Sequence, residues 1–415
     1  MAEKRDSKKK SANKAEKAVV KAAKRTAKKH PGLVVATIVI VLVIIAVGVV
    51  LYLKVDKVHD AVNSLFVQNK AEVQNTASAP PKANTYGDKD LSFHFLELGN
   101  NYTGDSTYIK AGDVDILIDA GSRQDSADAI GSYIDNYCTD GKLEYVIATH
   151  AHQDHIAGFT NTKSRDGVFK RYECGVIIDF ALTNATSAVY TNYVAARDEE
   201  VAAGAKHYTA MDCVAERNGA QKTYVLGEGM TMTILYQRFY EETSGDENNY
   251  SVCVLFNHGD NYYLLTGDLE KEGEASLVEN NALPEVKLFK AGHHGSYTAS
   301  TDALLSVIKP QIVCVCCCAG AVEYTQNTEN TFPSQAFINR IAPYTTQVYV
   351  TTLGSVEYST DKNKYVDVGF ASMNGVITVL SSGGEVTVSC SNNNTLLKDT
   401  EWFQANRTRP PAWAA

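Results

Sequence analysis

Three histidines and one aspartate fall within six residues of this chain, in the stretch Thr149-His-Ala-His-Gln-Asp-His155. An apolar segment, residues 144–149, runs directly into them. In an extended chain, side chains at i and i+2 point the same way, so His150 and His152 can hold one ion. A turn then brings Asp154 and His155 to a neighbouring position. Imidazole and carboxylate at this density indicate a site for zinc or a similar divalent ion. The alternative, a polar loop with incidental histidines, is disfavoured because the chain has only ten histidines.

Two later segments offer more ligands. Asp268 follows the apolar stretch 262–266, and Gly267 would let the chain approach a metal closely. A simple turn residue is the alternative for Asp268. His293 and His294 follow the apolar stretch 286–290. Because neighbouring side chains diverge, we expect one of these histidines to bind metal and the other to face substrate, and the sequence leaves open which.

Together these motifs resemble the metallo-β-lactamase fold superfamily, whose HxHxDH motif is matched in full. More narrowly, the chain resembles the hydrolase domain of ComEC-type competence proteins, which take up DNA. That likeness covers roughly residues 90–385. It rests on further segments in the expected order, namely 95–106, 116–121, 248–251, 264–270 and 289–296.

The resemblance implies an αββα sandwich of the α/β (α+β) class that holds two divalent ions, zinc first and manganese as the alternative. His150 and His152 would bind the first ion. Asp154, His155 and either His293 or His294 would bind the second, and Asp268 would bridge the two. Two such ions activate a hydroxide for hydrolysis.

The resemblance also gives roles to residues around the ions. Asp154 would help to orient the hydroxide, and the histidine not bound to metal would donate to the leaving oxygen. Ser296 would bind a phosphate oxygen, with a turn cap as its alternative. Asp105 and Asp119 would support the ligands from behind.

The chain departs from the family pattern in two places. Where a histidine often precedes Pro-Ser, this chain reads Thr331-Phe332-Pro333-Ser334. No mid-chain histidine clearly completes the first metal site. His207 is a weak candidate in a polar stretch, and His258 falls in an expected hairpin turn. The third ligand of the first metal is therefore open.

Charge and hydropathy divide the chain into segments. Residues 1–30 hold twelve Lys or Arg and three acids, so the rest of the chain carries a net charge of −18. Residues 33–53 form an uncharged apolar run long enough to cross a bilayer as one helix. A cleaved signal peptide is the alternative, but the run is too long and no cleavage site follows closely. The basic residues before it place the N-terminus in the cytoplasm and the rest of the chain outside.

We therefore expect a basic cytoplasmic tail over residues 1–32, a single transmembrane helix over 33–53 and a stalk over 54–88. A hydrolase domain would span 89–390, and a polar C-terminal extension would span 391–415. Short apolar strands interleaved with helices fill the hydrolase domain, as expected for two packed sheets with helices outside. Cys314, Cys316, Cys317 and Cys318 are interpreted as a buried strand rather than as a metal or disulfide cluster.

The expected function is a membrane-anchored phosphodiesterase or nuclease that acts on DNA or a cell-surface polymer. The alternatives are a hydrolase of phosphorylated cell-wall or head-group esters, a non-catalytic metal-binding surface module, and a lactone, thioester or lactam hydrolase. One membrane span forms no channel, so DNA transport is not expected. No obligate protein partner is indicated.

Overall fold

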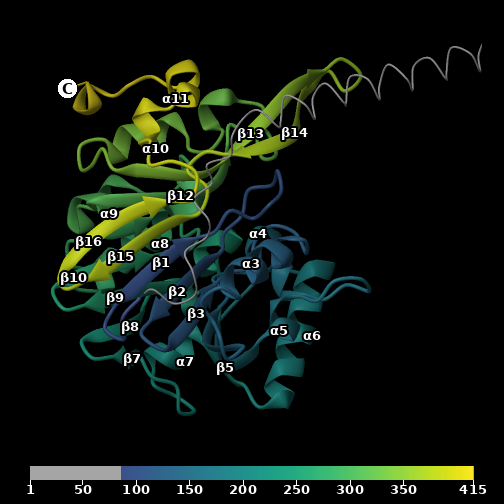
Figure 1. Ribbon diagram of the computed structural model, residues 1–415, viewed down its shortest axis with the longest axis vertical. Coiled ribbons are helices and arrows are strands. Elements are labelled where there is room, and N and C mark those ends of the chain that lie inside the picture. Colours follow the sequence, from purple (N-terminus) through teal and green to yellow (C-terminus); the bar gives the residue numbers. More distant parts are fainter. Residues whose placement is uncertain (1–85, 415) are drawn as a thin grey trace, which may run out of the picture. The chain divides into compact units, whose positions relative to one another are not determined.

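The computed structural model describes residues 86–414, which form two mixed eight-stranded sheets (Figure 1). The first has the order β16-β15-β1-β2-β3-β4-β5-β6. Its strands are β1 (Leu91–Phe95), β2 (Thr107–Ala111), β3 (Val114–Ile118), β4 (Lys142–Ile147), β5 (Glu173–Asp179), β6 (Lys206–Thr209), β15 (Ile377–Ser382) and β16 (Glu385–Cys390).

The second sheet has the order β14-β13-β12-β11-β10-β9-β8-β7. Its strands are β7 (Thr223–Gly227), β8 (Met230–Leu235), β9 (Cys253–His258), β10 (Asn261–Leu265), β11 (Leu288–Lys290), β12 (Ile312–Ala319), β13 (Val348–Ser359) and β14 (Lys364–Ser372). Four successive strands are parallel in each sheet: β3 to β6, which end at one edge of the first sheet, and β10 to β13, in the middle of the second.

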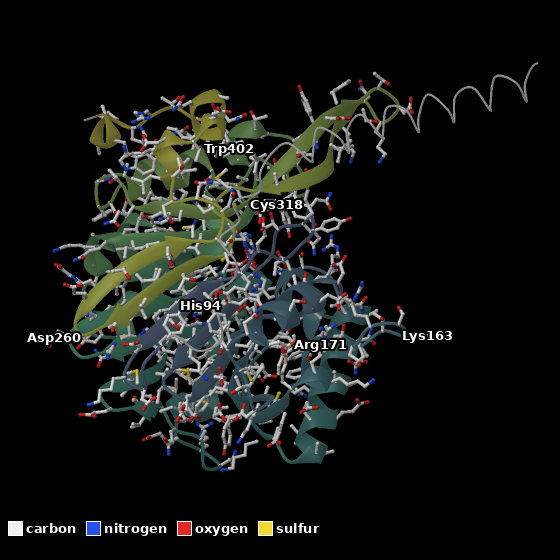
Figure 2. The ribbon with its side chains drawn as sticks, in the orientation of Figure 1. His94, Lys163, Arg171, Asp260, Cys318 and Trp402 are labelled. Carbon is white, nitrogen blue, oxygen red and sulfur yellow. The ribbon has the colours of Figure 1, made fainter. Side chains whose placement is uncertain are left out.

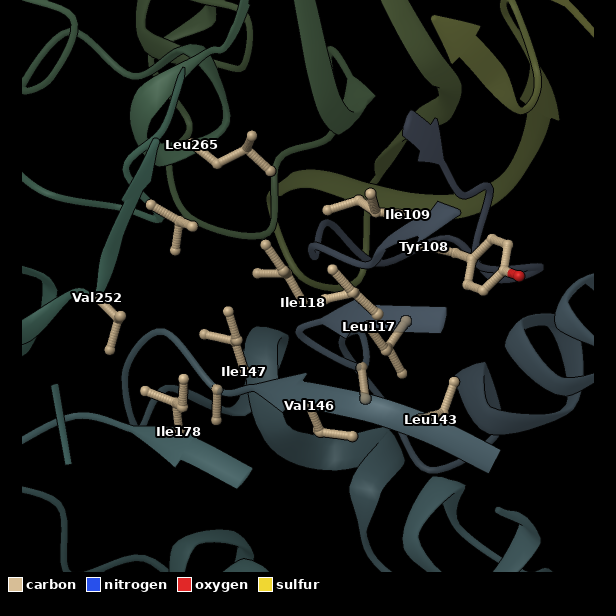
Figure 3. Packing of buried hydrophobic residues seen from close by; sticks show 14 of the residues in the cluster. Tyr108, Ile109, Leu117, Ile118, Leu143, Val146, Ile147, Ile178, Val252 and Leu265 are labelled. Carbon is tan, nitrogen blue, oxygen red and sulfur yellow. The ribbon is translucent and has the colours of Figure 1, made fainter. Parts of the chain in front are cut away.

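The two sheets pack face to face through apolar side chains. The ring of Phe93 in β1 lies 5.3 Å from that of Phe256 in β9 and 4.8 Å from that of Tyr263 in β10. Figure 3 shows side chains of both sheets gathered in this interior, Ile118 and Ile147 from the first and Leu265 from the second. The candidate ligands follow β4 in the first sheet and β10 and β11 in the second, so the packing of this layer determines how close they come.

Helices cover the outer faces. On the first sheet these include α3 (Ser126–Ile134), α5 (Val168–Arg171) and α6 (Ala188–Ala203). On the second they include α8 (Lys271–Asn280), α9 (Asp302–Ile308) and α10 (Gln335–Ile341), whose buried apolar residues form a separate cluster. The order of layers is helix, sheet, sheet, helix, which agrees with the fold class expected from the sequence.

The expected strands and helices are present, with ends shifted by a few residues. Two strands, β6 and β7, carry little strand signal in the sequence, because both are short, lie at sheet edges and hold no long apolar run. β13 continues well beyond the sheet to Ser359 and pairs with β14 as a long hairpin, visible in Figure 1. Exposed polar residues in its outer half hide this extension in the sequence.

The C-terminal segment packs on the domain rather than forming a purely polar extension. Leu397, Phe403 in α11 (Glu401–Asn406) and Trp413 are buried in the cluster that covers the second sheet. The Trp413 indole Nε1 donates to the carbonyl oxygen of Thr345 at 2.8 Å. Three large apolar side chains at wide spacing gave no periodic pattern, so the sequence did not reveal this packing.

The cysteine-rich strand is buried, as expected. Every residue of β12 is buried, and none of the nine cysteines, all of which lie between residues 86 and 414, is in a disulfide. Figure 2 labels Cys318 in this strand. These thiols fill space between the sheet and its neighbours as small apolar side chains.

Between residues 86 and 414, no helix is long and apolar enough to cross a membrane. The expected basic tail, transmembrane helix and most of the stalk lie outside the described residues. The domain boundaries drawn from the sequence stay predictions.

Candidate metal centre

Four expected ligands come together where strand ends of the two sheets meet. Asp154, His155, Asp268 and His294 are all buried, and their ligand atoms lie within 4.8 Å of one another. His155 Nε2 lies 3.0 Å and His294 Nε2 lies 3.1 Å from the same oxygen, Asp268 Oδ2. His294 Nε2 is also 3.3 Å from Asp154 Oδ2. Two imidazole nitrogens and two carboxylates therefore converge on one point.

Asp119 orients His155. Its Oδ2 lies 2.7 Å from His155 Nδ1, and the Thr149 amide and hydroxyl donate to its two oxygens at 2.8 and 2.7 Å. A carboxylate that accepts at Nδ1 fixes the tautomer, so the neutral ring turns the Nε2 lone pair toward the centre. This is the supporting role that the sequence indicated for Asp119.

His294 is oriented in the same way from the other sheet. Its Nδ1 lies 2.8 Å from the carbonyl oxygen of Cys316 and 3.2 Å from Asp105 Oδ1. A carbonyl oxygen can only accept, so Nδ1 carries the hydrogen, and Nε2 of the neutral ring is free to bind a metal.

The backbone decides which of the two neighbouring histidines enters the centre. His293 and His294 both adopt left-handed conformations, with φ of 44° and 54°. Two such residues in succession are strained for non-glycine residues and turn the chain sharply. His294 joins the buried cluster, whereas His293 Nδ1 lies 2.9 Å from Glu270 Oε1 and 3.1 Å from the Thr298 hydroxyl. The geometry thus favours His294 as the ligand.

A buried lysine balances the acids beneath the centre. Lys290, the last residue of β11, contacts Asp105 and lies 3.4 Å from Asp268 Oδ1. It also donates to the carbonyl oxygen of Gly267 at 3.1 Å. We did not predict Lys290, although a lysine closing an apolar strand beside a ligand motif is a usable signal, because such charges are rarely buried unpaired.

These contacts shift the ionisation of the cluster. Burial opposes charge on His155 and His294, but the surrounding carboxylates together outweigh it and raise the pKa of both imidazoles well above the ordinary value. Asp268 acts on both rings, Asp119 adds to it at His155, and Asp105 adds to it at His294. Burial likewise favours the neutral form of Asp154, yet the close contact with His294 and the charge of His155 hold its pKa well below the ordinary value. The two carboxylates and two imidazoles of this cluster thus attract one another, and both are ligand types that bind a metal cation.

The first expected metal site is less complete. His150 Nε2 lies 3.0 Å from His152 Nδ1, which agrees with two rings that face one position, and His152 is exposed. Ser251 stands beside them, with its hydroxyl 3.5 Å from His150 Nδ1 and accepting from the Asp268 amide at 3.1 Å. Within residues 86–414, no group of three or more possible ligands includes His150 or His152.

Neither mid-chain histidine supplies the missing ligand. His207 Nε2 is 2.8 Å from Asp179 Oδ1, in a pairing that also includes Arg197. His258 Nδ1 is 2.8 Å from the Ser381 hydroxyl, at the turn expected from the sequence. The bridging role of Asp268 toward this first site stays a prediction.

Gly267 is required where Asp268 approaches the motif. Its φ is 55°, and a side chain there would come within 2.9 Å of Thr149 Cβ and 3.0 Å of the Ser251 hydroxyl oxygen. Only glycine fits so close to the end of β4. The expectation that this residue permits close approach therefore agrees with the packing.

Ser296 lies in a local turn. Its hydroxyl is 2.9 Å from the Thr298 hydroxyl and accepts from the Thr298 amide at 3.2 Å, and the side chain is buried. These contacts correspond to the turn-cap alternative rather than to a phosphate-binding group.

Tyr324 contacts the centre and was not predicted from the sequence. The Tyr324 hydroxyl donates to Asp154 Oδ2 at 2.7 Å. The two residues are 170 positions apart, and nothing near Tyr324 in the sequence marks it. Burial and the neighbouring carboxylates raise the pKa of this phenol, so it remains a hydrogen donor.

The donor set fits a divalent transition metal. His294 Nε2 is buried and has no hydrogen-bond partner of good geometry, although it faces two carboxylates. Nitrogen and carboxylate ligands with outer hydrogen bonds on each ring match zinc and related ions. Asp154, His155, Asp268 and His294 would hold the ion, and His150 and His152 would serve a second one.

Comparisons with known proteins agree with this geometry. Residues 99–168 match the metallo-beta-lactamase superfamily. The chain is 33% identical over 69 residues to "Recombination protein 2" of Haemophilus influenzae, which is 17% of this chain and 8% of that protein. It is 36% identical over 67 residues to "ComE operon protein 3" of Bacillus subtilis, which is 16% of this chain and 8% of that protein. The matched segment thus spans under a tenth of each relative.

Solved structures of low identity were also found. The metallo-beta-lactamase fold protein YhfI of Bacillus subtilis is 12% identical, with a TM-score of 0.31 over 54% of this chain and 85% of that one. The metallo-beta-lactamase SMB-1 is 13% identical, with a TM-score of 0.32 over 53% of this chain and 82% of that one. Over residues 99–168 the chain is thus similar to the metallo-beta-lactamase superfamily, with weak homology to the ComE operon and recombination proteins.

Proposed function

We propose that this chain is a metal-dependent phosphodiesterase that cleaves DNA or a related polymer. The observation that carries the proposal is the buried convergence of His155, His294, Asp154 and Asp268 on one point. Members of the superfamily are metal-dependent hydrolases, and the resemblance implies an aspartate, Asp268, in the bridging position. In this superfamily an aspartate there is a feature of phosphodiesterases rather than of zinc β-lactamases, so it supports phosphodiesters as the substrate.

The residues would divide the work as follows. When bound, two divalent ions supply an activated water and stabilise negative charge on the phosphoryl oxygens. Asp119 and Asp105 keep His155 and His294 in their metal-binding orientation. His293, held by Glu270 at the edge of the centre, is the group available to give a proton to the leaving oxygen.

The relatives support nucleic acid as the substrate. One of the matched proteins is named as a recombination protein, and the resemblance to DNA-uptake proteins extends through several motifs. The matched segment is a small part of each relative, so a shared substrate is a proposal for this chain.

The acidic character of the chain supports a second candidate, a hydrolase of phosphorylated cell-wall or head-group esters. Residues beyond the basic tail carry a net charge of −18. Such a surface repels a long polyanion and gives no general steering toward nucleic acid. A short or membrane-bound phosphodiester would be less affected.

We also propose that residues 33–53 anchor the chain in the cell membrane, with the N-terminus in the cytoplasm and the catalytic domain outside. The uncharged apolar run and the lysines and arginines before it support this placement.

A substrate panel tests the proposed activity. The full chain, loaded with zinc or manganese, would be assayed on bis-p-nitrophenyl phosphate, nitrocefin, single-stranded and duplex DNA, RNA and teichoic-acid fragments. We expect diesterase activity and no nitrocefin turnover. Nitrocefin hydrolysis without diesterase activity would instead identify a lactamase, and metal binding without hydrolysis of any substrate would identify the non-catalytic metal-binding module.

Asp268→Ala provides the matched test of the centre. Because Asp268 Oδ2 faces both His155 and His294, its loss should remove metal and lower diesterase activity by at least about 100-fold. Metal content by mass spectrometry and initial rates measure this. Wild-type activity in Asp268→Ala would show that the assigned centre is wrong.

A further inference from the structure

The loop after β12 carries a tyrosine onto the metal centre. The Tyr324 hydroxyl donates to Asp154 Oδ2 at 2.7 Å, and that same oxygen lies 3.3 Å from His294 Nε2. Half of the Tyr324 side chain is nevertheless exposed. Among the exposed large apolar side chains of residues 86–414, Tyr324 alone bonds to a candidate ligand.

Neighbouring residues hold this loop without help from the hydroxyl. Glu323 pairs with Arg123 at 2.9 Å and accepts from the Thr103 amide at 3.3 Å. The Val322 amide donates to Asp367 Oδ1 at 2.8 Å. Beyond Tyr324, the Gln326 side chain donates to the carbonyl oxygen of Tyr365 in β14 and accepts from the amide of the same residue. The ring position of Tyr324 is therefore set by the loop, and the hydroxyl is free to change partner.

The ring also belongs to an aromatic wall beside the second histidine pair. Tyr324 lies 5.5 Å from Phe332, ring centre to ring centre, and Phe332 lies 5.6 Å from both His293 and His294. A phosphodiester that reaches Asp154 and His294 from solvent would thus meet the Tyr324 hydroxyl at its entry.

We propose that Tyr324 is a catalytic residue whose hydroxyl donates a hydrogen bond to a non-bridging oxygen of the phosphodiester. The inference rests on the proposed function, since it takes the substrate to be a phosphodiester. A tyrosine has an ordinary pKa of about 10, so the phenol is a neutral donor at physiological pH. On substrate binding it exchanges Asp154 for the phosphoryl oxygen. Negative charge grows on that oxygen in the transition state, where a fixed donor is most effective.

Tyr324→Phe tests the proposal because it removes the hydroxyl and keeps the ring against Phe332. The matched control is Tyr297→Phe, since Tyr297 is equally exposed, close to the His293–His294 turn, and makes no side-chain hydroxyl bond within the described part of the chain. We expect Tyr324→Phe to lower kcat on bis-p-nitrophenyl phosphate by about 100-fold. Metal content and Tm should match the wild type, and Tyr297→Phe should behave as wild type.

Two results would overturn the assignment. One is a kcat for Tyr324→Phe within twofold of wild type. The other is a loss of metal in proportion to the loss of activity, which would mean that the hydroxyl only supports Asp154.

Titration with inorganic phosphate separates this inference from the proposed function. In the metal-loaded full chain, Tyr324→Phe should weaken phosphate binding by about fivefold, the effect of one net hydrogen bond. If wild type binds phosphate but cleaves no diester, the proposed function fails while the phosphate titration still decides the role of Tyr324. Equal phosphate affinity in both proteins, or none in either, would refute the role.

Discussion

At the residue scale, the metal-facing nitrogens of His155 and His294 are each backed by an acceptor on the opposite side of the ring. Asp119 holds His155, and the Cys316 carbonyl with Asp105 holds His294. Lys290 then offsets part of the negative charge of Asp105 and Asp268. Buried charges of this density persist only when they are paired, so the supporting residues are as necessary as the ligands.

Asp119→Asn tests this support. Asp119 has a φ of 60°, a conformation that asparagine tolerates, so the change removes charge with little backbone strain. We expect metal affinity to fall by about 10- to 100-fold while the fold is kept. Competition with a chromophoric chelator measures this. Asp128→Asn serves as control, because Asp128 is a half-exposed acid in α3 that pairs with Arg165 and Arg171 rather than with a candidate ligand. Equal affinity in the two variants would contradict the role of Asp119.

His94 provides a pH-dependent prediction away from the metal centre. It is fully buried in the first sheet, bonded to Ser92 and Tyr133 and labelled in Figure 2, and burial lowers its pKa to about 3. In the unfolded chain its pKa is about 6.5. Stability is therefore complete above pH 6.5 and is lost at about 1.4 kcal/mol per pH unit as the pH falls toward 3.

Comparison with His94→Gln isolates this effect from other titrating groups. Between pH 7.5 and 5, urea unfolding should show that wild type loses about 2 kcal/mol more than the variant. Parallel losses in both proteins would mean that His94 is protonated in the folded state.

At the element scale, the ligands come from loops at strand ends in both sheets. His155 and Asp154 follow β4 in the first sheet, whereas Asp268 follows β10 and His294 follows β11 in the second. The loop after β12 adds Tyr324 and is tied to the hairpin of β13 and β14 through Gln326. The packing between the sheets thus determines whether the ligands meet.

The C-terminal segment stabilises the second sheet from outside. Trp413 is buried against Phe403, and the two rings are 5.7 Å apart. Trp413→Ala should lower the free energy of unfolding by about 3–5 kcal/mol, through lost burial and the cavity that remains. Urea denaturation measures this. Trp402→Ala, in the same segment but only partly buried, should cost clearly less, and an equal cost would argue against this packing.

At the scale of the whole molecule, a basic tail and an apolar run precede an acidic folded domain. If residues 33–53 span the bilayer, the full chain should stay with membranes after carbonate extraction, and deletion of these residues should release it. Protease added to intact cells should reach the folded domain but not the tail, because positive residues remain on the cytoplasmic side. Release of the undeleted chain by carbonate would contradict the anchor.

The sequence alone predicted the candidate ligand types and the layered fold. Two local features predict the ligands. One is the spacing of the motif His150-x-His152-x-Asp154-His155, and the other is the position of Asp268 and His293-His294 directly after apolar strands. Residues so close in sequence can adopt few relative positions, so these patterns indicate metal binding without long-range information. The alternation of apolar strands with helices likewise predicted two covered sheets.

Only the tertiary structure decided how these pieces meet. It turned His294 rather than His293 inward, set Ser251 beside His150, and brought Lys290 and Tyr324 to the centre. Each of these depends on contacts between residues far apart in the chain. Such contacts are fixed by the packing of the two sheets and by paired charges in their interior. The sequence marks individual strands and single charged residues, but not which of them meet.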